Sequence, residues 1–187
     1  MPEEPSIKTR SLTVSMALTA SFTALGVILA PITWTIVVGT QASPGTHFVL
    51  TLAGVLIGPW WASLVAVLVG IIRMGLGVGT IFAFPGGIPG GLLVGLAYKW
   101  TSKFKGRLAH YSAAFFEPVG VTLLGGTLTL LVIAPLVGSK PLMGLVERSG
   151  LYLALLTIWG GWTPGAAIGC ILGYFTLLAL DRAALRL

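Results

Sequence analysis

The feature that most constrains this chain is the near absence of charge over most of its first half. Arg73 is the only formally charged residue between Ser11 and Tyr98. Two further uncharged stretches cover residues 118–139 and 149–180. A membrane-spanning helix needs about 20 predominantly apolar residues, and the chain is 56% hydrophobic and 9% charged. The sequence therefore predicts an all-α integral membrane protein and excludes an ordinary soluble domain.

Six apolar segments can be distinguished, separated by turn-forming residues. They are Ser11–Val38, His47–Gly58, Trp60–Arg73, Gly86–Trp100, Phe116–Val137 and Pro164–Leu180. A helical turn at Leu151–Trp159 could precede the last one, and the turn-rich stretch Gly39–Thr46 is predicted to be a loop. We interpret residues 1–10 as a cytoplasmic N-terminal segment and residues 11–187 as one six-helix membrane domain.

Residues His47–Arg73 could form a hairpin of two short helices or one helix kinked at Pro59. Twelve helical residues span only ~18 Å, less than the ~30 Å hydrocarbon core. With a hairpin, eight of the 11 Lys and Arg residues lie inside and three outside, whereas a single helix moves the Lys99–Arg107 cluster outside. The eight are Lys8, Arg10, Lys99, Lys103, Lys105, Arg107, Arg182 and Arg186. The positive-inside rule thus favours six spans with both termini in the cytoplasm.

Arg73 opens a glycine-rich run that reaches Gly87. A cation in or beside the membrane core is costly, so it commonly faces a cavity, a partner charge or a ligand. Gly75, Gly77 and Gly79 disfavour a helix, and non-helical backbone at membrane depth persists only where protein or a water-filled cavity covers it. The run therefore predicts a small-molecule pocket near the outer face, although Arg73 could instead extend towards the headgroups.

Glycines recur every fourth residue in the fourth and sixth segments. Such stripes let helix backbones approach closely in lipid, and ordinary internal packing is the stronger interpretation. The positions are Gly87, Gly91 and Gly95, then Gly165, Gly169 and Gly173.

Three motifs occur in a characteristic order. They are Gly54-Val-Leu-Ile-Gly58-Pro59-Trp60-Trp61, then Arg73, then Gly77-Val-Gly79-Thr80-Ile-Phe-Ala83-Phe84-Pro85-Gly86. This series resembles the ThiW type of substrate-binding S component in energy-coupling factor (ECF) transporters, and Glu117-Pro118-Val-Gly120 resembles the start of that family's fifth helix. The resemblance is good from Gly39 to Gly125 and rests on hydropathy at the two ends.

The resemblance implies a cell-membrane protein that binds the thiamin precursor hydroxyethylthiazole near the extracytoplasmic face. It also implies a membrane coupling subunit and two ATPase subunits as partners. Ala20 and Ala24 form an Ala-x-x-x-Ala step of the kind that packs against the coupling subunit in S components. The sequence has no G-x-x-x-x-G-K-[ST] phosphate loop, so we expect the partners to use ATP and this chain to need no cofactor.

Polar candidates for the pocket lie near the predicted outer face. His47 could bond or stack on a heteroaromatic ring, or it could face headgroups at a helix start. Gln41 lies nearby, six residues before His47, where the family pattern has an adjacent Gln-His pair, so the exact substrate stays open. Thr80 belongs to the motif after Arg73. The other histidine, His110, lies in a predicted cytoplasmic connection, and no metal site is expected.

Aromatic candidates cluster near the same face and suit a flat thiazole ring. Tryptophans also form belts at membrane interfaces, so we expect about two of these five side chains to touch ligand. They are Trp34, Phe82, Phe84, Trp159 and Trp162, of which Phe84 and the pair Trp159 and Trp162 are favoured. Thr163-Pro164 is predicted to start a helix after that pair.

Glu117 precedes Pro118 at a predicted helix start on the cytoplasmic side. A carboxylate there is stabilised by the helix dipole and needs no ligand, which is the favoured interpretation. A role in coupling or helix positioning is the alternative.

Three classes of function remain. The first is an importer subunit, for hydroxyethylthiazole or for another heterocycle such as thiamin or a pyrimidine precursor. The second is an intramembrane serine enzyme, for which Ser63 is a poor nucleophile because no G-x-S-x-G setting surrounds it. The third is a non-catalytic assembly or lipid-binding protein. We expect no enzyme.

Overall fold

The computed structural model describes residues 11–33, 35–38 and 40–184, so the predicted cytoplasmic segment and Trp34 lie outside the described residues. The first half contains helix α1 (Leu12–Ile32), strands β1 (Thr35–Val37) and β2 (Thr40–Ala42), and helices α2 (Pro44–Leu56), α3 (Pro59–Gly75) and α4 (Ala83–Thr101). The second half contains α5 (Arg107–Tyr111), η1 (Ser112–Phe116), η2 (Val119–Gly126), η3 (Thr129–Ile133), α6 (Ala134–Leu136) and α7 (Lys140–Ala184).

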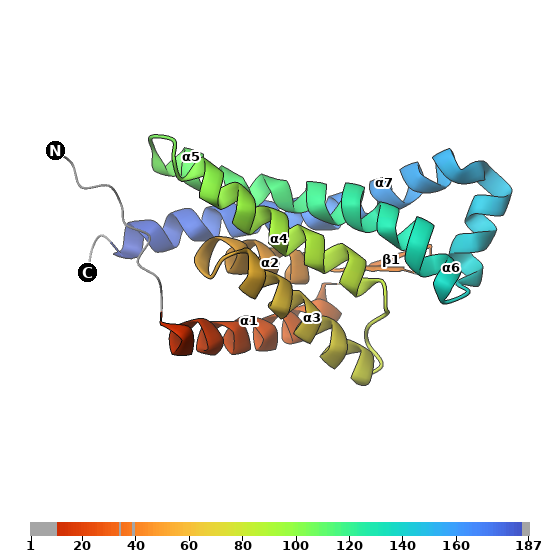
Figure 1. Cartoon of the computed structure of the whole chain (residues 1–187), viewed down its shortest axis with the longest axis horizontal. Coiled ribbons are helices and arrows are strands. Elements are labelled where there is room, and N and C mark those ends of the chain that lie inside the picture. The colour runs from red at the N-terminus through yellow and green to blue at the C-terminus, as the bar shows by residue number, and fades with distance from the viewer. Residues whose placement is uncertain (1–10, 34, 39, 185–187) are drawn as a thin grey trace.

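The helices run up and down along one long axis (Figure 1). The start of α1, the connection between α4 and α5, and the end of α7 lie at one end of the bundle, and the β hairpin and the α6–α7 turn lie towards the other. The prediction of an all-α membrane protein is confirmed. Among the described residues, three helical stretches are long and apolar enough to cross a membrane: Leu12–Ile32, Arg107–Leu136 and Lys140–Ala183. The six-span count and the cytoplasmic orientation stay predictions.

The hairpin of two short helices is present. α2 ends at Leu56 and α3 begins at Pro59, with Gly58 between them at φ 91°. Only glycine adopts this backbone conformation readily, and Pro59 sits at the first helical position where its missing N–H costs little. α4 then packs along α3 in the opposite direction, so closely that a Cβ on Gly95 would lie 2.4 Å from the Pro59 nitrogen.

The first predicted segment was too long, and the loop prediction for Gly39–Thr46 was wrong. α1 ends at Ile32, one residue after Pro31, and a two-stranded antiparallel ribbon follows in which Ile36 pairs with Gln41. β-branched residues dominate this stretch and favour extended backbone over helix. α2 then begins at Pro44, three residues earlier than predicted.

The last two helices are also longer than predicted. Helical structure is continuous from Arg107 to Leu136, with a 3₁₀ turn and two π-helical stretches, so Glu117 is not at a helix start. α7 covers Lys140–Ala184 but is interrupted at Gly150, whose φ of 77° and ψ of 160° are non-helical, so two helical parts meet there at a kink. Pro164 lies inside α7, so the prediction that Thr163-Pro164 starts a helix was wrong.

Candidate substrate-binding site

A cavity lies beside the β hairpin, at the end of the bundle opposite the Lys99–Arg107 connection. The cavity is open at its mouth, and the space between its walls is about 450 Å³ when that open solvent is counted. Segments far apart in the sequence supply its walls: β2, the first turns of α2 and α4, the end of α3, the loop Leu76–Phe82, η2 and α7. The polar and aromatic lining residues are Gln41, Ser43, Thr46, His47, Arg73, Thr80, Phe82 and Trp162.

Arg73 lies in the last turn of α3 and is 4% exposed. Its Nη2 donates to Gln41 Oε1 at 3.1 Å and to the carbonyl oxygen of Val78 at 3.4 Å. Gly79 folds back onto the arginine, because a Cβ there would lie 2.7 Å from Arg73 Cβ. Within the described residues, Arg73 makes no ion pair with a carboxylate. The guanidinium therefore braces the glycine-rich loop while it keeps its positive charge beside the cavity.

The electrostatics of the cavity favour ligand atoms that accept hydrogen bonds. The first turns of α2 and α4 border it, so the positive ends of two helix dipoles lie near Arg73. The Gln41 amide oxygen is occupied by Arg73, which leaves its amide N–H groups as the donors that it can offer. A neutral heterocycle with acceptor atoms suits this environment better than a cation does.

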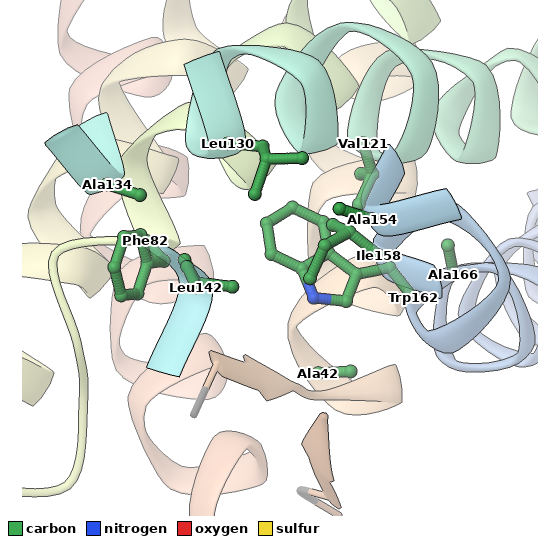
Figure 2. Close-up of a cluster of buried hydrophobic side chains, with 10 residues drawn as sticks. All are labelled: Ala42, Phe82, Val121, Leu130, Ala134, Leu142, Ala154, Ile158, Trp162 and Ala166. Carbon is green, nitrogen blue, oxygen red and sulfur yellow. The ribbon is translucent and has the colours of Figure 1, made fainter. Parts of the chain in front are cut away.

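Trp162 forms an aromatic wall and is 3% exposed. Its Nε1 donates to Thr40 Oγ1 at 2.8 Å, which fixes the plane of the indole. Figure 2 shows the indole in the middle of a buried apolar cluster that includes Phe82, Leu130 and Ile158. Gly86 adds room, because a Cβ there would lie 3.4 Å from the Trp162 ring. The rigid ring is thus held at the wall of the cavity.

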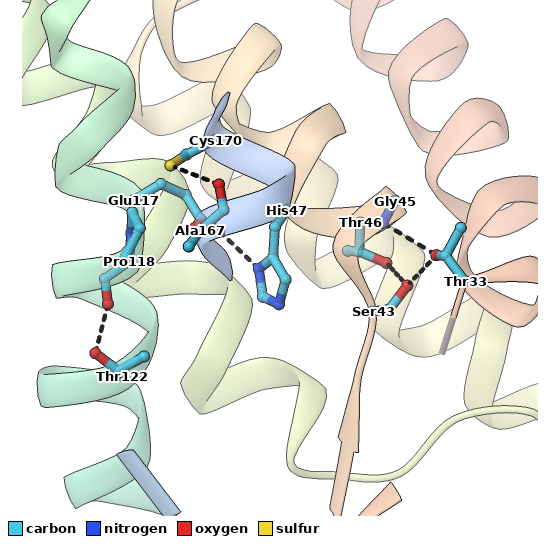
Figure 3. A network of polar contacts seen from close by, with 10 residues as sticks. All are labelled: Thr33, Ser43, Gly45, Thr46, His47, Glu117, Pro118, Thr122, Ala167 and Cys170. Atoms are coloured by element: carbon cyan, nitrogen blue, oxygen red, sulfur yellow. Dashed lines mark hydrogen bonds and ion pairs between the residues drawn. The ribbon is translucent and has the colours of Figure 1, made fainter. Parts of the chain in front are cut away.

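A small network of hydroxyl groups ties the end of α1 to the start of α2 (Figure 3). Ser43 Oγ donates to the carbonyl oxygen of Ala30 at 3.2 Å, and Thr46 Oγ1 donates to Ser43 Oγ at 3.2 Å. Thr33 Oγ1 accepts from the backbone N–H of Gly45 at 3.0 Å. These bonds hold Ser43, Thr46 and, one residue later, His47 at the cavity wall.

His47 pairs with Glu117 from the Arg107–Leu136 helix. The two atoms His47 Nδ1 and Glu117 Oε1 are 2.7 Å apart, Glu117 is fully buried and His47 is 8% exposed. The expectation that Glu117 is an ordinary dipole-stabilised helix-start carboxylate was wrong, because the helix begins ten residues earlier, at Arg107, and folding carries Glu117 against α2. A buried ionisable pair at membrane depth is a candidate functional group.

The match to a known family covers almost the whole chain. Residues 16–183 match the family described as "Thiamine-precursor transporter protein (ThiW)". The chain belongs to this family. It is accordingly a multi-pass membrane protein of a thiamine-precursor transporter family. Among curated proteins, none matches this chain.

In this ThiW-family chain, the cavity brings together six of the residues singled out from sequence: Gln41, His47, Arg73, Thr80, Phe82 and Trp162. Phe84 instead packs against α3, since a Cβ on Gly70 would lie 2.8 Å from its ring. Trp159 lies beside Gly126 and donates from Nε1 to Thr127 Oγ1 at 3.3 Å. Neither lines the cavity, whereas Phe82 does. Contact of any of these side chains with a ligand stays a prediction.

Ala20 and Ala24 lie on the exposed face of α1, which packs against α2 and α3 with its other face. Met16, Ile28 and Ile32 are also exposed on α1, at 57%, 60% and 73%. The placement is compatible with a partner helix, and the contact itself stays a prediction.

Sequence reasoning did not count Ser43 and Thr46, which line the cavity, among the site residues, and it considered Glu117 but did not place it at the site. The signal that could have identified it is its isolation, since it lies between the basic connection and the uncharged stretch 118–139 of a membrane protein. Its partner could not be identified from sequence because His47 lies 70 positions earlier in the chain.

Proposed function

We propose that this chain is the substrate-binding subunit of an ATP-driven importer in the cytoplasmic membrane, with hydroxyethylthiazole as its ligand. A membrane coupling subunit and two ATPase subunits complete the importer. The observation that carries the proposal is the cavity in which Arg73, Gln41, His47 and Trp162 converge from four separate segments.

The ligand's chemistry matches the walls of the cavity. Its thiazole ring is flat and can stack on Trp162, which adds about 0.5–1.5 kcal/mol beyond area burial. Its ring nitrogen can accept from the donors of Arg73 or Gln41, and its hydroxyl can bond to His47. Thiamin carries a positively charged thiazolium ring, which the charge of Arg73 and the two helix dipoles disfavour.

The alternative ligand is another small neutral heterocycle, in particular the pyrimidine precursor of thiamin. It is favoured by the same observation, since a neutral ring with acceptor nitrogens also suits the cavity. The enzyme alternative is weaker, because the hydroxyl of Ser63 donates to the carbonyl oxygen of Pro59 in its own helix and Ser63 does not line the cavity.

Titration of intrinsic tryptophan fluorescence tests the proposal. The purified chain is titrated with hydroxyethylthiazole, hydroxymethylpyrimidine and thiamin in parallel. We expect saturable quenching by the thiazole at the lowest concentration and the weakest response to thiamin. Tighter binding of the pyrimidine would identify a different substrate for the same class of importer subunit. No response to any of the three compounds would contradict the proposal.

A further inference from the structure

The two residues of the buried pair, His47 and Glu117, occupy different positions relative to the cavity. His47 Nδ1 lies 2.7 Å from Glu117 Oε1, and Figure 3 shows the second ring nitrogen turned away from Glu117. His47 lines the cavity, whereas Glu117 lies behind it and is fully buried. The imidazole therefore lines the cavity with Glu117 bonded behind it, so Glu117 can act on a ligand through the histidine ring.

Close packing of two helices places the carboxylate. A Cβ on Gly120 would lie 2.6 Å from the carbonyl oxygen of Pro89, and a Cβ on Gly90 would lie 3.2 Å from Glu117 Oε1. The absence of side chains at these glycines lets the Arg107–Leu136 helix approach α4 and leaves room for the carboxylate. The position of Glu117 is thus set by the backbone and not by a flexible side chain.

A carboxylate at Nδ1 decides which nitrogen of the ring carries the proton. A neutral imidazole has one donor nitrogen and one acceptor nitrogen, and the hydrogen bond made at one of them selects the tautomer. An ionised carboxylate only accepts, so beside a neutral imidazole it would hold the proton on Nδ1 and leave Nε2 as an acceptor. The same arrangement orients histidine ligands in many metal sites.

We propose that Glu117 is a positioning residue that holds His47 with Nε2 as a hydrogen-bond acceptor, so that the cavity selects a heterocycle bearing a hydroxyl group. This inference rests on the proposed function and adds a determinant of specificity to it. Glu117 itself does not touch the ligand. The ligand's hydroxyl donates to His47 Nε2, and an analogue that lacks the hydroxyl covers that nitrogen without supplying a donor.

Selectivity between two thiazoles is the first test. Hydroxyethylthiazole is compared with 4-methyl-5-ethylthiazole, which has the same ring and lacks the hydroxyl. We expect the unmodified chain to prefer the hydroxyl compound by about tenfold to a hundredfold, the range expected for one buried hydrogen bond. Glu117→Leu is expected to lower affinity for the hydroxyl compound by about tenfold and to change affinity for the ethyl compound less than twofold.

Two variants serve as controls. The amide oxygen of Glu117→Gln can still accept from Nδ1–H, so this variant is expected to retain most of the preference. Glu147→Gln changes an exposed carboxylate on α7 and is expected to leave both affinities unchanged. Equal losses for both thiazoles in Glu117→Leu would indicate a purely structural role and would overturn the inference, and so would an unchanged preference.

Nitrogen NMR of the histidines tests the tautomer in the unmodified, ¹⁵N-histidine-labelled protein, so the result does not depend on whether Glu117→Leu folds. The chain has two histidines, and His110→Gln identifies the signal of His47. We expect a protonated Nδ1 and an unprotonated Nε2. A proton on Nε2 would overturn the inference. If no thiazole bound the protein, the proposed function would fail, while the tautomer would still be decided by this measurement.

Discussion

At the scale of single residues, the main feature is a buried cation without an ionic partner among the described residues. Arg73 bonds only to neutral oxygens, those of Gln41 and Val78. Each bond from a charged donor contributes ~1.5–3 kcal/mol, which partly offsets the cost of burying the guanidinium. A ligand acceptor placed beside Arg73 would add a further charge-assisted bond. We therefore expect Arg73 to contribute both to the stability of the loop and to the affinity for a ligand.

Replacement of Arg73 is expected to weaken ligand binding in graded steps. Arg73→Lys keeps the charge but places it on a shorter side chain without the planar guanidinium, and we expect affinity for hydroxyethylthiazole to fall about tenfold. Arg73→Ala should cause a larger loss. Fluorescence titration measures both, with Arg148→Ala as the control because Arg148 is exposed and bonds within its own helix. Unchanged affinity in Arg73→Ala would contradict a role in binding.

The two neighbouring tryptophans of α7 are expected to behave differently. Trp162 lines the cavity, whereas Trp159 packs against Gly126 outside it. Trp162→Phe should therefore remove most of the ligand-induced change in fluorescence, and Trp159→Phe should preserve it. The reverse result would move the ligand to the other face of α7.

At the scale of helices, the glycine stripes determine which helices touch. The predicted packing role of both stripes is confirmed. Cβ atoms added at Gly87 and Gly91 would lie 3.2 and 3.1 Å from the Cβ atoms of Ala66 and Ala62 on α3. On α7, Gly165 approaches Pro44, Gly169 approaches His47 and Gly173 approaches Thr51, all on α2. α7 and α2 are therefore in close backbone contact beside the site.

Two glycines of α7 make a matched test of this packing. A Cβ on Gly169 would lie 2.6 Å from His47 Cβ, so Gly169→Ala should destabilise the protein by ~1–3 kcal/mol through overpacking. Gly160 is exposed with nothing within 4 Å of an added Cβ, and Gly160→Ala should be neutral or stabilising by up to ~1 kcal/mol. Thermal unfolding in detergent compares the two. Equal melting temperatures would contradict the close contact.

At the scale of the whole molecule, the alternation of helix directions places the cavity and the basic connection at opposite ends. The cavity lies beside the β hairpin, and residues Lys99–Arg107 lie at the end that also holds the start of α1. The positive-inside rule therefore predicts that the cavity opens on the outer side of the membrane. This is the side from which an importer must receive its ligand.

Cysteine labelling in intact cells tests this orientation. The buried Cys170 is first replaced by alanine, and a single cysteine is then introduced at one of two exposed lysines, Lys105 or Lys140. A membrane-impermeant maleimide is expected to label Lys140→Cys and to label Lys105→Cys only after the cells are opened. The opposite pattern would invert the topology and place the cavity on the cytoplasmic side.

Much of the fold follows from local properties of the sequence. The α2–α3 hairpin, the close-packing glycines and the non-helical run after Arg73 could be predicted because proline, glycine and charge act within a few residues of their own position. Helix ends were less predictable. Pro164 lies inside α7 and does not mark a helix start, whereas α1 ends one residue after Pro31.

The candidate site divides in the same way. Arg73, His47 and Gln41 could be singled out from sequence, because a polar group in an apolar membrane segment is costly and commonly has a functional role. The convergence of these residues with Trp162 could not be predicted from sequence. It was also not predictable that Phe82 and not Phe84 would line the cavity, because this depends on how the loop Leu76–Phe82 leads into α4.

By itself, therefore, the sequence determined that the protein is embedded in lipid, that it is all-α and that its Lys and Arg residues are unevenly distributed between the connections. These properties follow from sequence because hydrophobicity and charge belong to each residue wherever it lies. Only the tertiary structure decided that Glu117 pairs with His47 and that one cavity gathers side chains from the hairpin, the α3–α4 loop and α7. Such pairings depend on how closely helix backbones approach, and that distance arises from the packing of all the helices together.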